Sequence, residues 1–164
     1  ACQDKEVIKD NSHLDTKFTK TGDVTRSADN PFDNGFWSGD FDGTGDYVQT
    51  TPYDSNLINW TAEAWTIEYF IHARAFASAG SGIGATNVAS NADIGSTSEY
   101  WSFGPLSNGT VRWYYWNGAQ QHLTTTDTLT TNRWYHLAFV HDGSNGMKKG
   151  SKYIDGNTGN EVTV

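Results

Sequence analysis

The stretch Trp65-Thr66-Ile67-Glu68-Tyr69-Phe70-Ile71-His72-Ala73 decides the fold class. Its apolar residues recur at every second position from Trp65 to Ile71, which is the period of a β-strand, whose side chains alternate between two faces. Phe70 interrupts the otherwise polar second face, so we expect that face to be partly covered. The stretch therefore predicts a long strand with one clean core face.

Further strand-like runs lie on both sides of this one, and turn-forming pairs separate them. Asn108-Gly109 and Asn117-Gly118 favour the type I′ turns of hairpins, because both residues accept a positive φ. The expected strands are 6–8, 17–20, 38–42, 46–50, 65–73, 100–103, 110–116, 121–125, 133–141, 152–155 and 161–164. Strands this closely spaced, with no helical period between them, predict an all-β fold in the form of an antiparallel two-sheet sandwich.

The composition agrees with a single β domain that binds neither nucleic acid nor membranes. The chain has 164 residues, 14% of them aromatic, which fits one domain with a large core. Its net charge of −8 would repel phosphate surfaces, and no apolar run approaches the roughly 20 residues of a membrane helix. Cys2 is the single cysteine, so no intrachain disulfide forms.

Four segments, in this order, resemble the motifs of laminin-G-like domains of the concanavalin A-like lectin/glucanase kind. They are Gly39-Asp40-Phe41-Asp42-Gly43-Thr44-Gly45-Asp46-Tyr47-Val48, Trp65–Ile71, Asn132–Val140 and Tyr153-Ile154-Asp155-Gly156. The resemblance implies a concanavalin A-like jelly-roll sandwich over 39–164. Residues 1–38 would add an N-terminal strand and a leading loop, giving one domain overall.

The end of the chain departs from this pattern. Laminin-G-like sandwiches normally continue with further strands, whereas this sequence ends at Val164. We therefore expect a sandwich without its last strands, either a piece of a longer polypeptide or one completed by a neighbouring chain through strand addition.

A second resemblance lies upstream, in segments including Ala1-Cys2-Gln3, Asp10-Asn11-Ser12 and Gly22-Asp23-Val24. These are similar to the region preceding such domains in repetitive virion proteins of marine cyanobacterial phages, carried on fibres or capsid surfaces. The resemblance implies a non-catalytic structural or recognition module of a larger surface protein, located on a virion or outside the cell. Its expected partners are other copies or chains of the assembly. A dedicated carbohydrate-binding, lectin-like domain is the alternative.

A glycan-binding face is expected on the strand 110–116, because aromatic residues occupy both of its faces. A strand face open to water normally carries polar residues. Aromatic rings stack on the C–H faces of sugars, and flanking polar groups bond the hydroxyls. The expected ligand-binding residues are Arg112, Tyr114, Trp116, Asn117 and Gln121. The other interpretation is that a loop or an adjoining module covers this face.

A calcium site is a further expectation that the family resemblance raises. Asp40, Asp42 and Asp46 lie within seven residues around the turn Gly43-Thr44-Gly45, and Ca²⁺ prefers clustered carboxylate and carbonyl oxygens. Aspartate is also a common turn former in its own right, so no cofactor is required by this pattern.

Glycoside hydrolysis is the second alternative, kept because the fold hosts it. A retaining enzyme needs two carboxyl groups about 5–5.5 Å apart, for which an E-x-D-x-x-E-like run on one strand is the sequence sign. The five glutamates are isolated and form no such run: Glu6, Glu63, Glu68, Glu99 and Glu161. His136 is interpreted as a packed strand histidine. We therefore expect the chain not to be an enzyme.

Overall fold

The computed structural model describes residues 10–32, 35–51, 64–76, 89–90, 100–116, 120–142, 149–154 and 157–163. Regular structure in these ranges consists of β-strands, and every strand pairing is antiparallel. The expected all-β antiparallel fold is confirmed. In this part of the chain, no helix has the length and hydrophobicity to cross a membrane.

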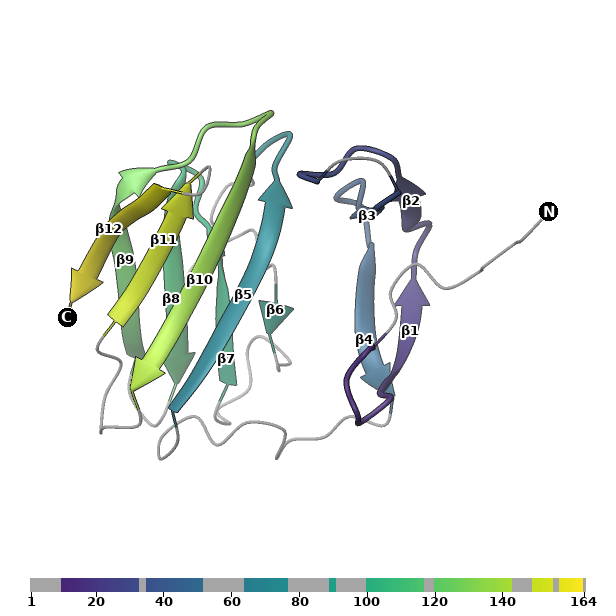
Figure 1. Cartoon of the computed structure of the whole chain (residues 1–164), viewed down its shortest axis with the longest axis horizontal. Coiled ribbons are helices and arrows are strands. Elements are labelled where there is room, and N and C mark those ends of the chain that lie inside the picture. Colours follow the sequence, from purple (N-terminus) through teal and green to yellow (C-terminus); the bar gives the residue numbers. More distant parts are fainter. Residues whose placement is uncertain are drawn as a thin grey trace. The chain divides into compact units, whose positions relative to one another are not determined.

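The chain divides into two compact units, Ala1–Leu57 and Ile58–Val164. The second unit contains two four-stranded sheets, which lie face to face in Figure 1. The first has the order β12-β11-β10-β5, with β5 at Ala64–His72, β10 at Trp134–Asp142, β11 at Lys149–Ile154 and β12 at Asn157–Thr163. The other has the order β6-β7-β8-β9, with β6 at Ala89–Ser90, β7 at Tyr100–Pro105, β8 at Thr110–Trp116 and β9 at Gln120–Thr128.

The core lies between these two sheets and is built from the alternating positions that the sequence indicated. Its buried cluster takes side chains from both sheets: Phe103, Val111, Trp113, Leu123, Leu129, Tyr135, Leu137 and Phe139. Trp65, Ile67, Tyr69 and Ile71 of β5 pack against that cluster. The rings of Trp65 and Trp113 lie 5.0 Å apart, so the two sheets meet through aromatic contacts. Each such side chain contributes about 1.5–3 kcal/mol when fully buried.

One of the expected turns can be followed in the described residues. Gly109 has a φ of +83° and lies between β7 and β8, but the φ of Asn108 is not positive, so the turn is not the expected type I′. Strands β11 and β12 pair with Ile154 opposite Asn157. Residues 155–156 themselves lie outside the described residues, as do residues 6–8 and the turn at Asn117-Gly118.

The first unit contains two two-stranded sheets. Strand β1 (Lys17–Thr21) pairs with β4 (Tyr47–Thr51), and β2 (Thr25–Ser27) pairs with β3 (Ser38–Asp40). Among the described residues of this unit, Val24 is the buried hydrophobic side chain.

The strand-like runs on either side of the turn Gly43-Thr44-Gly45 do not pair with each other. Strand β3 pairs with β2, and β4 pairs with β1. Chain segments 17–27 and 38–51 thus form one interrupted ribbon with a bend in each segment. The two units divide between Leu57 and Ile58, so β3 and β4 both belong to the first unit.

Candidate functional site

The predicted glycan face on β8 is covered at its centre. Tyr114 is only 2% exposed, so a sugar could stack on its ring only if the groups covering it moved. Arg112 is half-buried, and its Nε donates a hydrogen bond to Thr124 Oγ1 at 3.1 Å. Val111 and Trp113 on the opposite face are buried in the core. Strand β8 is therefore buried on both faces at Trp113 and Tyr114.

The strand register locates the backbone of the remaining predicted residues. Gln121 of β9 lies opposite Tyr115, whereas His122 lies opposite Tyr114. The side chains of Trp116 and Gln121 lie outside those that the structure describes, so their part in a glycan site stays a prediction. Trp116 lies opposite Gln120 at the end of β8, and Asn117 falls outside the described residues.

The outer face of β5 and β10 presents a different set of aromatic and polar side chains. Phe70 lies opposite His136 in the register, and their rings are stacked with centroids 4.5 Å apart and planes 15° from parallel. The phenyl ring is 42% exposed although it is large and apolar. Glu68 Oε2 lies 3.3 Å from His136 Nε2, and the glutamate side chain is 66% exposed. An aromatic surface thus adjoins a solvent-exposed carboxylate.

A second ring pair extends this surface along the two strands. His72 and Trp134 lie opposite each other, with ring centroids 5.4 Å apart. We call Glu68, Phe70, His72, Trp134 and His136 the β5–β10 platform. The alternation on each strand already separated these residues from the core. The pairing register, which brings these residues of the two strands side by side, cannot be read from the sequence. From the sequence alone, His136 was interpreted as a packed strand histidine.

The acidic loop of the first unit brings together a set of carboxylates that differs from the expected one. Carboxylate oxygens of Asp23, Asp42 and Asp46 lie within 4.8 Å of one another, whereas Asp40 is not in this group and lies on β3 opposite Thr25. Sequence reasoning missed Asp23 because it is 23 positions from Asp46 along the chain.

The hydrogen bonds of Asp46 explain why this loop needs a carboxylate. Its Oδ1 accepts the backbone N–H of Asp23 at 2.8 Å, and its Oδ2 accepts the backbone N–H of Asp42 at 3.0 Å. The Asp42 amide holds the pKa of the Asp46 carboxyl below its usual range. Desolvation, the next largest effect, opposes it, and the Asp23 contacts and the charge of Lys20 add to the lowering. Asp46 thereby ties together the two bends of the interrupted ribbon.

The same donor set fits Ca²⁺ only in part. Three carboxylates offer oxygens at suitable separations, but Ca²⁺ takes 6–8 oxygen ligands, and both oxygens of Asp46 already accept N–H groups.

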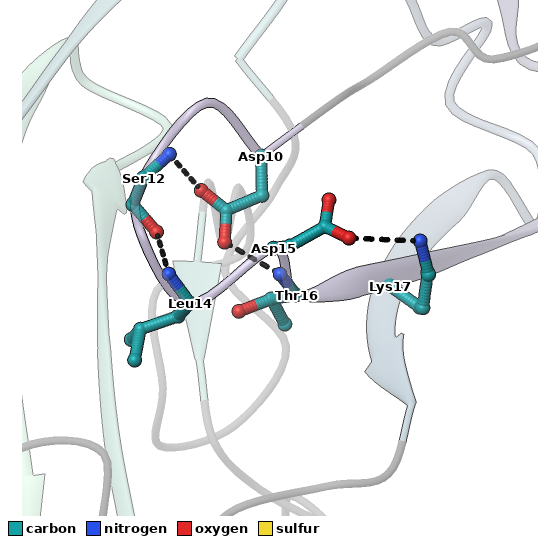
Figure 2. Close-up of polar contacts among 6 residues, drawn as sticks. All are labelled: Asp10, Ser12, Leu14, Asp15, Thr16 and Lys17. Atoms are coloured by element: carbon teal, nitrogen blue, oxygen red, sulfur yellow. Dashed lines mark hydrogen bonds and ion pairs between the residues drawn. The ribbon is translucent and has the colours of Figure 1, made fainter.

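Asp10 plays the same part in the loop that precedes β1, as Figure 2 shows. Its carboxylate accepts the backbone N–H of Ser12 and that of Thr16, each at 2.7 Å. These bonds, first among them those from Ser12, hold the pKa of Asp10 far below its usual range. They close a loop in which Asp15 adopts a φ of +45°. Asp10 and Asp46 are thus loop clamps, which accounts for part of the aspartate content without a ligand.

The comparisons with known proteins agree with the fold. A laminin-G family model, described as the concanavalin A-like lectin/glucanases superfamily, matches residues 42–164. No curated protein and no solved structure matches the chain. The matched segment includes β4 through β12 and therefore crosses from the first unit into the second. The chain belongs to the concanavalin A-like lectin/glucanases superfamily.

Proposed function

We propose that this chain is a non-catalytic recognition module that binds glycans through the β5–β10 platform. The observation that carries the proposal is the Phe70–His136 stack, which leaves Phe70 42% exposed on a sheet face beside an exposed carboxylate. Family membership supports a carbohydrate-binding or structural module in general terms. The buried ring of Tyr114 favours this face over the one on β8.

The chemistry of the platform suits a sugar ring. The C–H faces of pyranoses are apolar and carry a slight positive charge, which the negative face of an aromatic ring attracts. Hydroxyl groups at the ring edge need partners, and Glu68 and His136 lie beside the phenyl ring to supply them. A few convergent polar groups around an aromatic surface are the usual composition of a small-molecule site.

Phe70→Ala tests this proposal, with Phe18→Ala as a matched control in the first unit. The two side chains are similarly exposed, at 42% and 39%. We expect a glycan array to identify ligands of the unmodified chain, and Phe70→Ala to weaken their binding about tenfold, through loss of stacking worth about 0.5–1.5 kcal/mol plus apolar contact. Phe18→Ala should leave binding unchanged. Equal losses in both variants, or no ligand on the array, would contradict the proposal.

Participation in a surface assembly is a second candidate, and a separate observation favours it. Among the described residues of the first unit, seven large hydrophobic side chains are exposed: Leu14, Phe18, Phe32, Phe36, Trp37, Phe41 and Tyr47. Exposed apolar surface of this extent commonly marks an interaction site. We propose that it contacts other copies of this chain, or other chains of a larger protein on a virion or cell exterior.

Sedimentation velocity over a range of concentrations tests the assembly role. We expect concentration-dependent association that the double substitution Phe36→Ser and Trp37→Ser removes, because both side chains are more than half exposed, at 61% and 57%. A monomer at every concentration would count against self-assembly.

Calcium binding remains a proposal of the same kind, with Asp23, Asp42 and Asp46 as the residues that would hold the ion. A thermal melt with Ca²⁺ and with EDTA tests it. Because these residues supply only part of a calcium shell, we expect at most a small rise in melting temperature. Loss of that rise in Asp42→Asn would identify the site.

A further inference from the structure

The charge of the β5–β10 platform bears on which glycans it accepts. We infer that the platform selects neutral glycans and rejects those that carry carboxylate or sulfate groups beside the stacked ring. This inference rests on the proposed glycan-binding function. It follows from one side chain, Glu68, whose carboxylate lies 3.3 Å from the imidazole that stacks on Phe70.

A carboxylate discriminates between ligands by its hydrogen-bonding capacity. Ionised glutamate is an acceptor only, so it can pair with sugar hydroxyls, which donate. The carboxylate of a uronic acid and a sulfate ester are also acceptors only. Next to Glu68, neither the ligand's acidic group nor the glutamate would then have a donor for a hydrogen bond. Hydrogen bonds from hydroxyls to a carboxylate are about twice as strong as neutral ones, so Glu68 rewards a neutral ligand and penalises an acidic one.

Repulsion adds to this selection, and its size can be judged from the exposure of the side chain. Glu68 is 66% exposed, so a high effective dielectric constant applies. A ligand charge about 5 Å away would lose about two- to fourfold in affinity after screening at physiological salt. The net charge of −8 on the chain acts in the same direction.

Among the side chains that the structure describes on β5 and β10, Glu68 carries the carboxylate, and it lies in direct contact with the stacked imidazole. Charges beyond the screening length of about 8 Å at physiological ionic strength act on the stacked rings only weakly.

The experiment uses a glycan array that pairs neutral oligosaccharides with their sulfated and 6-carboxylated counterparts, probed with the full chain at pH 8, where histidine is ordinarily neutral. We expect the neutral member of each pair to bind better. Glu68→Gln should reduce the neutral-to-acidic preference by about two- to fourfold. It should also weaken binding to neutral sugars, because an amide oxygen is a weaker acceptor than a carboxylate. Glu161→Gln, the matched control, should leave the preference unchanged.

Each other outcome is decisive. Equal or stronger binding of the acidic members would overturn the inference and leave the glycan-binding function standing. An unchanged preference in Glu68→Gln would also overturn it, since another group would then be responsible. Binding to no member of any pair would refute the proposed function and the inference with it.

Discussion

The substitution Gly109→Ala should destabilise the second unit strongly, because two independent costs meet at one position. Gly109 adopts a φ of +83°, a conformation that costs a residue with a side chain about 1–2 kcal/mol. A Cβ there would also lie 2.5 Å from the carbonyl oxygen of Leu129, which is closer than real contacts allow. Leu129 is buried in the core, so its backbone cannot shift freely.

The size of the second cost, that of the Cβ clash, follows from the hydrogen bonds around this turn. Gly109 accepts the N–H of Leu129 at 2.8 Å and donates its own N–H to Leu106 at 2.8 Å. Relief of the clash would weaken at least one of these bonds, at about 1 kcal/mol. The sum is about 2–3 kcal/mol, and a unit of roughly 100 residues would then melt about 10 °C lower or more.

Urea unfolding followed by tryptophan fluorescence measures this change, because Trp65 and Trp113 lie in the core. Two variants separate the costs. Gly109→Asn reduces the conformational cost, since asparagine tolerates positive φ, but retains the Cβ clash and should remain destabilised. Gly43→Ala, at a φ of +88° with open space around it, should carry only the conformational cost and, because it lies in the first unit, should leave the tryptophan-reported unfolding of the second unit unchanged. A loss below about 0.5 kcal/mol in Gly109→Ala would refute this reasoning.

Three further predictions follow from single side chains. Leu137→Ala should cost about 2–5 kcal/mol in urea unfolding, because the leucine is 1% exposed within the core, whereas Phe70→Ala should change stability by less than half as much. Similar losses in both would contradict the assigned faces. Tyr69→Phe should leave the free energy of unfolding unchanged or raise it by up to about 1 kcal/mol, because the buried hydroxyl has no hydrogen-bond partner in the described structure. Burial also raises the pKa of this hydroxyl. A marked loss of stability would reveal a partner. The Asp46 clamp should weaken in acid. Because the pKa of the Asp46 carboxyl is lower in the folded than in the unfolded chain, the ionised group stabilises the fold above the ordinary aspartate pKa. That contribution is lost as the pH falls through the folded pKa. Amide exchange of Asp23 and Asp42, measured between pH 6 and 3, should show this loss of protection, and Asp46→Asn should remove its pH dependence; constant protection over that range would speak against the clamp.

The sequence by itself determined the strands of the second unit and the side of β5 that faces the core. Alternating apolar residues from Trp65 to Ile71 are sufficient for this, because the side-chain period of a strand is a local property. The position of the turn at Asn108-Gly109 was equally readable, since it depends on the positive φ that glycine favours, although its expected type I′ geometry was wrong because the φ of Asn108 is not positive. Both features arise within a few residues of chain and need no knowledge of the partner strand.

Only the tertiary structure decided which outer face is open and which carboxylates meet. Tyr114 and Phe70 both interrupt a polar alternation, yet one is 2% and the other 42% exposed, because burial depends on what packs over the strand. Asp23 joined Asp42 and Asp46 because hydrogen bonds between two bends of the ribbon bring together residues distant in sequence. Such long-range pairings leave no local pattern in the chain, so the candidate site emerged only from the fold.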